Sequence, residues 1–182
     1  MKYDPEKHHR RSTRLNGYDY AQPGAYFVTV CTRDRACLFG HVVNGEMHLN
    51  DAGEIAREQW LRTAQVRPNV ELDAFTIMPN HLHGIVVIHE QCRGTLQRAP
   101  TQTERFAQPT SNSIPIIVRL FKSATTIRIN VLRGAPGTPV WQRGYYEHVV
   151  RNEAELTAIR QYIQANPAQW DEDENNPDFA TQ

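Results

Sequence analysis

A buried β-strand preceded by a turn is predicted by the stretch Ile77-Met78-Pro79-Asn80-His81-Leu82-His83-Gly84-Ile85-Val86-Val87-Ile88. Alternate residues of a strand share a face, so His81 and His83 point the same way, about 7 Å apart along the chain. This spacing suits two ligands of one metal ion. A His-x-His pair is also common as an ordinary surface or packed pair, so a metal site needs further ligands from elsewhere in the chain.

The turn before the histidines makes this stretch the second arm of a hairpin. Pro79 has no N–H for a β-ladder and Asn80 tolerates turn geometry, so a strand is expected on either side. Another hairpin is predicted at Asn44-Gly45, a dipeptide that fits the turn type matching strand twist. The predicted strands span residues 25–32, 38–43, 46–49, 72–78, 81–88 and 140–150.

Three helices are predicted from apolar residues at helical spacing and from their capping residues. The clearest start is Asn152 with Glu155 three residues later, a pair in which each side chain caps a backbone N–H near the other. The predicted helices span residues 51–64, opened by Asn50 or Asp51; 114–132, opened by Ser113; and 153–165, ended by Asn166 and Pro167.

Length and composition fit one domain with a single core, because the chain has 182 residues of which 40% are hydrophobic. We expect a basic N-terminal arm over 1–16, a domain over 17–170 with a mobile loop at 91–112, and an acidic tail over 171–182. Neither a signal-like nor a bilayer-length apolar run is evident, so we expect a cytoplasmic protein without a membrane partner. The three cysteines form no Cys-x-x-Cys pair, which disfavours a disulfide framework and a zinc knuckle.

The net charge is zero, yet the basic residues are unevenly distributed along the chain. A polyanion such as DNA could bind the central basic region and the arm, although such residues can also form a solvated helix face. The candidate DNA-binding residues are Arg10, Arg11, Arg14, Arg119, Lys122 and Arg143.

Tyr162 and Asn166 lie four residues apart on one edge of the last predicted helix, which makes them neighbours in space. One interpretation is that Tyr162 borders the apolar stripe and Asn166 caps the helix. The other is catalytic: Tyr162 attacks a phosphodiester whose oxygens are held by a metal ion on His81, His83 and Asn166. Metal binding requires neutral imidazoles, so this activity should weaken as the pH falls through about 6.5.

Four segments of the chain, taken in order, resemble one family. Members of the REP-associated tyrosine transposases, within the single-tyrosine HUH transposase and nuclease superfamily, have similar motifs. The segments are Arg11-Ser12-Thr13-Arg14-Leu15-Asn16-Gly17-Tyr18-Asp19-Tyr20 with Gly24-Ala25-Tyr26-Phe27-Val28-Thr29-Val30-Cys31-Thr32; Met78-Pro79-Asn80-His81-Leu82-His83; Trp141-Gln142-Arg143-Gly144-Tyr145-Tyr146-Glu147-His148; and Tyr162-Ile163-Gln164-Ala165-Asn166-Pro167.

The resemblance implies a ferredoxin-like α+β sandwich with an antiparallel sheet. It implies cleavage and rejoining of single-stranded hairpin DNA through a 5′-phosphotyrosine intermediate, with Mg²⁺ or Mn²⁺ as the cofactor. The sequence leaves the oligomeric state open, and a homodimer is one candidate assembly. By position, Tyr162 is the nucleophile and His81, His83 and Asn166 are the metal ligands. Related enzymes of the superfamily carry glutamine where Asn166 stands.

Two alternatives remain open from the sequence. Tyr145 and Tyr146 also carry hydroxyl groups, although packing on a strand explains both. The chain could also bind hairpin DNA or RNA without cutting it, with a vestigial metal pair. A phosphoesterase with two His-x-Thr/Ser motifs is disfavoured, because Gly84 follows His83 and no second motif is found.

Overall fold

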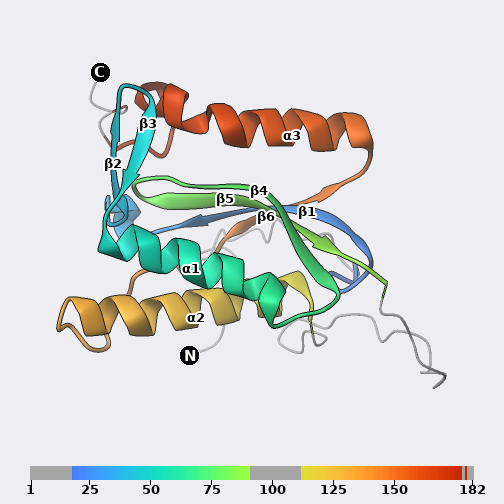
Figure 1. Cartoon of the computed structure of the whole chain (residues 1–182), viewed down its shortest axis with the longest axis horizontal. Helices are drawn as coiled ribbons and strands as arrows, with labels where there is room; N and C mark the ends of the chain where they lie inside the picture. The colour runs from blue at the N-terminus through green and yellow to red at the C-terminus, as the bar shows by residue number, and fades with distance from the viewer. Residues whose placement is uncertain (1–17, 91–111, 178, 180–182) are drawn as a thin grey trace, which may run out of the picture.

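A computed structural model describes residues 18–90, 112–177 and 179. Within this part of the chain, a four-stranded antiparallel sheet in the order β4-β5-β1-β6 forms the centre of the molecule (Figure 1). The strands are β1 (Gly24–Cys31), β4 (Val70–Ile77), β5 (His81–Ile88) and β6 (Tyr146–Val150). A separate hairpin of β2 (Gly40–Val43) and β3 (Glu46–Leu49) turns at Asn44 and Gly45, which both have positive φ angles, as the sequence predicts.

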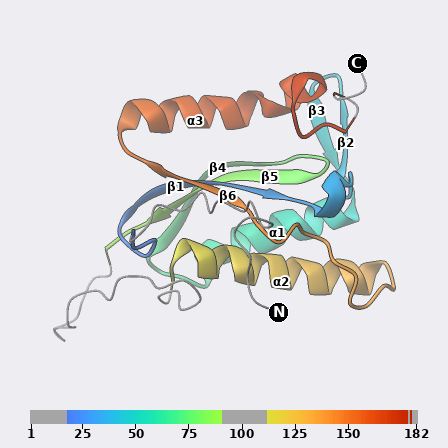
Figure 2. The ribbon, with the colours of Figure 1, turned by 180° about the vertical axis from the view of Figure 1, so that it is seen from behind.

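Helices cover both faces of the sheet. The two helices α1 (Asp51–Gln65) and α2 (Ile114–Leu132) pack on one face and α3 (Glu153–Ala165) lies on the other (Figures 1 and 2). Without the small hairpin and α3, the elements follow the order β1-α1-β4-β5-α2-β6, in which α1 crosses between two strands that flank β5. This order and this sheet define the expected ferredoxin-like α+β sandwich.

The face toward α1 and α2 contains the main hydrophobic core. Tyr26, Val28 and Val30 of β1 alternate toward this face and are fully buried with Leu82 and Val86 of β5. Trp60 of α1 packs edge-to-face on Phe121 of α2, with ring centroids 5.2 Å apart. Gly84 lets this tryptophan approach β5, since a Cβ at Gly84 would lie 2.5 Å from Cζ2 of Trp60.

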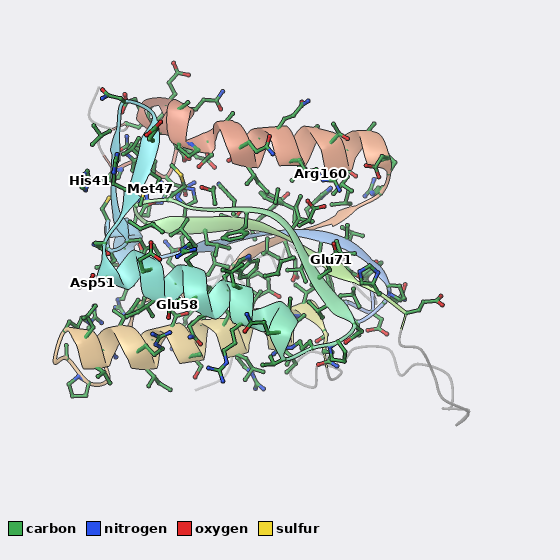
Figure 3. All side chains as sticks on the ribbon, viewed as in Figure 1. His41, Met47, Asp51, Glu58, Glu71 and Arg160 are labelled. Carbon is green, nitrogen blue, oxygen red and sulfur yellow. The ribbon has the colours of Figure 1, made fainter. Side chains whose placement is uncertain are left out.

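The face toward α3 has a different character, because strand alternation places ionisable and aromatic side chains there. Thr29 of β1 lies between His83 of β5 and Tyr146 of β6, and Phe27 pairs with His148. Arg160 of α3 reaches toward the sheet and binds Asp73 of β4, with Nη2 and Oδ2 2.6 Å apart (Figure 3). The sheet therefore separates an apolar core from a polar layer beneath α3.

One strand is shorter than predicted. Residues 140–150 were expected to form one strand, but β6 begins only at Tyr146, and Trp141 makes a single bridge with Thr32. The intervening segment is held by Lys122, whose ammonium group donates to the carbonyls of Gln142 and Gly144. These carbonyls therefore accept side-chain hydrogen bonds.

The predicted arm over 1–16 lies outside the described residues, as do residues 91–111 of the predicted loop. In the part of the chain that the structure describes, no helix combines the length and apolar character needed to cross a bilayer.

Candidate metal and tyrosine site

His81 begins β5 and is fully buried, with one ring nitrogen oriented by its neighbour. The Asn80 amide donates from Nδ2 to the carbonyls of Arg35 and Asn175, which fixes the direction of its Oδ1. That oxygen lies 2.9 Å from Nδ1 of His81 and only accepts, so Nδ1 carries the proton. Nε2 is consequently left with its lone pair, and it has no hydrogen-bond partner among the described residues. A buried imidazole nitrogen that carries no proton has a free lone pair with which it can bind a metal ion.

His83 connects β1 to the tyrosine on α3. Its Nδ1 lies 2.8 Å from the hydroxyl of Thr29, and its Nε2 lies 3.2 Å from the hydroxyl of Tyr162. The rings of His83 and Tyr162 also meet at a centroid distance of 5.1 Å. The predicted nucleophile and the predicted His-x-His pair therefore meet within a single chain.

The third side of the site comes from residues after α3. Asp173 follows the short 3₁₀ helix Asn166–Glu172, and its side chain is only 4% exposed. Its Oδ2 lies 3.7 Å from Nε2 of His81 and accepts a hydrogen bond from Nδ2 of Asn166 at 3.3 Å. Oδ1 of Asn166 is buried without a partner in the described part of the chain. Asn166, predicted as the third metal ligand, thus lies beside the cluster, and the carboxylate of Asp173 joins it.

These groups fit a divalent metal ion. The ligand atoms of His81, His83 and Asp173 all lie within 4.8 Å of one another. Ligands about 2.1 Å from one ion lie at most about 4.2 Å apart, so small side-chain shifts close this set around a metal. The carboxylate oxygen supplies the hard donor that Mg²⁺ and Mn²⁺ prefer, and two imidazoles alone do not.

Burial keeps both imidazoles neutral. It lowers the pKa of His81 to about 4, and this effect outweighs the opposing influence of the Asp173 carboxylate. Burial and the neighbouring His81 hold the pKa of His83 well below its usual range. Protonation therefore competes with a metal ion only at a pH below the value near 6.5 expected from an ordinary histidine.

The hydroxyl of Tyr162 is protonated at neutral pH. Partial burial is the main cause that raises its pKa, and the carboxylates of Asp173 and Glu174 add to this effect. The phenolic proton must consequently be removed as the oxygen attacks. Nε2 of His83 lies within hydrogen-bond distance of this hydroxyl, in the position that a proton acceptor would need.

The basic candidates are not gathered at this site. Arg119 and Lys122 lie on α2, on the sheet face opposite α3, and the Lys122 ammonium is bound to two backbone carbonyls. Burial lowers the pKa of Lys122 to about 8. Arg143 is exposed in the segment before β6, and Arg10, Arg11 and Arg14 lie outside the described residues.

Sequence reasoning missed Asp173, which was assigned to an acidic tail without a role. A chemical signal was present: two imidazoles and an amide lack the carboxylate that Mg²⁺ favours, which points to a nearby acidic residue as a further ligand. Five acids follow the last helix, and spacing alone does not say which of them turns back. The 3₁₀ helix that opens with Asn166 and Pro167 sets this return.

Comparisons with known proteins bear on the family and the fold of the chain. No protein-family model matches the chain. It is 43% identical over 177 residues to an uncharacterised protein of Haemophilus influenzae, and the match covers 95% of this chain and 96% of that protein. A second Haemophilus influenzae protein, named as a REP-associated tyrosine transposase, is 25% identical over 150 residues, with 82% of this chain and 73% of that protein covered.

A solved structure described as a REP-associated tyrosine transposase bound to a REP hairpin has the same fold. The TM-score is 0.59 at 20% identity, over 88% of this chain and 74% of that one.

The fold and the site define a ferredoxin-like protein with a His-x-His pair and a tyrosine on a covering helix. The chain belongs to one family with the uncharacterised Haemophilus influenzae protein. Its resemblance to the REP-associated tyrosine transposases, expected from the motifs, is confirmed.

Proposed function

We propose that the protein is a metal-dependent transesterase that cleaves and rejoins single-stranded hairpin DNA, with Tyr162 as its nucleophile. The observation that carries the proposal is the 3.2 Å contact between the Tyr162 hydroxyl and Nε2 of His83, beside buried His81 and Asp173. The hairpin substrate is suggested by the related structure, which is described as a REP-associated tyrosine transposase bound to a REP hairpin.

His81, His83 and Asp173 would hold the metal ion, with Oδ1 of Asn166 as a further donor. A bound Mg²⁺ or Mn²⁺ would polarise a phosphoryl oxygen and offset the charge that develops on it. Asn80 and Thr29 would not bind the metal ion themselves. Their hydrogen bonds to His81 and His83 would orient the two imidazole rings toward it.

Tyr162 would perform the covalent step. Its phenolic oxygen forms a bond to phosphorus while the bond from phosphorus to O3′ breaks, and the leaving O3′ takes up a proton as the phenol loses one. The 5′-phosphate stays esterified to Tyr162, so attack by a 3′-hydroxyl on this ester rejoins a strand without an external energy source. Phe27 packs edge-on to the Tyr162 ring at a centroid distance of 6.2 Å and thereby limits its movement.

The test is a gel assay with end-labelled single-stranded DNA from hairpin repeats that flank the gene, in Mg²⁺ or Mn²⁺. The wild-type protein should give a slowly migrating covalent protein–DNA band and a product with a free 3′-hydroxyl. Tyr162→Phe should give neither, because it lacks the hydroxyl and retains the ring. Tyr145→Phe is the matched control and should still form the adduct.

A different result would favour the alternative function, binding of hairpin DNA without cleavage. DNA that is bound but uncut by both wild type and Tyr162→Phe, across metals and repeats, would contradict the transesterase and indicate a binding module. Adduct formation that persists in Tyr162→Phe and is lost in another tyrosine variant would refute the assignment of the nucleophile alone.

A further inference from the structure

A hollow of about 310 Å³ adjoins Tyr162 on the side away from the candidate metal ligands His81 and Asp173, neither of which lines it. It lies between α3 and the end of the sheet that carries β6, and Tyr162 itself forms one wall. Phe27 and Tyr146 supply further aromatic surface, and His148 with Glu155 supplies the polar rim. The volume is at the lower end of the range for pockets that take small planar ligands.

Phe27 organises the aromatic part of this hollow. Its ring stacks on His83 at 5.5 Å and meets the rings of Tyr146 and Tyr162 edge-on, each at 6.2 Å. Tyr146 is nevertheless 46% exposed and Tyr162 43% exposed. Two aromatic rings that converge on one support and keep nearly half of their surface accessible form a stacking platform.

The polar rim is held in place by the cap of α3. Nε2 of His148 lies 2.7 Å from Oε1 of Glu155, and Oε2 of Glu155 accepts the backbone N–H of Arg151. Both side chains remain about one-third exposed, at 32% and 31%. A fixed carboxylate beside an imidazole offers hydrogen-bonding groups to the edge of a base stacked on the platform.

We propose that this pocket holds one unpaired nucleobase of the DNA strand, next to the phosphodiester that Tyr162 attacks. The inference rests on the proposed function, because Tyr162 must reach the phosphate for the adjoining base to reach the pocket. One nucleotide then makes two contacts, its phosphate at the tyrosine hydroxyl and its base against Tyr146. The contact between the base and Tyr146 determines which phosphate faces the Tyr162 hydroxyl, since the base and its phosphate belong to one nucleotide.

The test places 2-aminopurine at successive unpaired positions beside the hairpin and measures its fluorescence on Tyr162→Phe protein, which cannot cut. One position should be quenched by stacking. Adding Tyr146→Leu should remove this quenching and weaken DNA binding about tenfold or more, as expected for loss of one base–aromatic stack. Adding Tyr146→Phe, which retains the ring, should preserve the quenching. Val131→Ala, on the exposed surface of α2, is the control for an unrelated apolar truncation and should leave binding unchanged.

A second measurement uses an abasic nucleotide at the quenched position. The abasic site should weaken binding by the same factor as Tyr146→Leu, and the two changes together should weaken it no further, because they remove one contact. Quenching at no position, or quenching that Tyr146→Leu leaves intact, would overturn the pocket.

The two proposals fail separately. A covalent adduct without position-specific quenching refutes the pocket and leaves the transesterase proposal standing. Quenching that depends on Tyr146, without any adduct, supports base binding in the pocket and contradicts the transesterase.

Discussion

Asp173 sets the charge of the proposed metal site, because it brings a buried carboxylate to two neutral imidazoles. Asp173→Asn should lower the affinity for Mn²⁺ and Mg²⁺ by at least about tenfold, since an amide is a weaker ligand than a carboxylate. Isothermal titration of metal into the protein without DNA measures this directly. Glu174→Gln, at the exposed neighbouring residue, is the control. Equal affinities for Asp173→Asn and wild type would exclude Asp173 from the site.

Gly84 governs the contact between β5 and α1. Gly84→Ala should destabilise the fold by about 1–3 kcal/mol, because the new methyl group would lie 2.5 Å from the buried ring of Trp60. Urea unfolding measures the change. Gly144→Ala is the matched control, since its Cβ would meet nothing within 4 Å, and it should have little effect. Equal losses in both variants would show that glycine freedom, and not the Trp60 contact, is what matters.

At the scale of elements, α3 is joined to the sheet by the ion pair between Arg160 and Asp73. Arg160 donates to both carboxylate oxygens and lowers the pKa of Asp73. Arg160→Ala should reduce the free energy of unfolding, and it should slow adduct formation because Tyr162 lies on the same helix. Arg57→Ala, which removes an exposed pair within α1, should cost less and leave the rate intact. Stability loss without a slower rate would separate α3 docking from catalysis.

Elements with strong local signals were predictable from the sequence. Asn44-Gly45 specified its hairpin, and alternation placed His81 and His83 on one face of β5. The cap at Asn152 is also confirmed, although Glu155 binds the N–H of Arg151 and not that of Asn152. The start of β6 and the return of Asp173 were not predictable. Both depend on contacts between segments far apart in the chain, which periodicity does not encode.

At the scale of the whole molecule, a single chain supplies both the proposed nucleophile and the candidate metal ligands. Tyr162 and His83 belong to the same chain and touch at 3.2 Å. A mixture of His81→Ala and Tyr162→Phe proteins should therefore form no more adduct than either variant alone, as measured by the covalent-band assay. Recovery of the band in the mixture would require a helix exchanged between two subunits, and with it a homodimer, an assembly that the sequence leaves open.

Acid should destabilise the metal-free protein through His81. Its pKa is about 4 in the folded state and near 6.5 when unfolded, so below pH 6.5 the unfolded chain binds the proton first. Stability is thus retained above pH 6.5 and lost as the pH falls toward 4, by roughly 2 kcal/mol between pH 7 and 5. Urea unfolding at the two pH values measures this loss. His81→Asn should lose less, and His89→Gln, at an exposed histidine, should behave as wild type. An equal loss in His81→Asn would assign the effect elsewhere.

The two faces of the central sheet also bear on how this protein can change over evolutionary time. Along β5 every second side chain faces the aliphatic core and the residues between them face the polar layer. Drift in the core can exchange one aliphatic residue for another at Leu82 or Val86 without altering the groups that do chemistry. Substitutions at His81 or His83 change the groups of the polar layer and leave the aliphatic side chains on the other face of the strand in place. In this single strand, selection for a stable fold acts on the residues that face the core. Selection for activity acts on the residues between them, which face the polar layer.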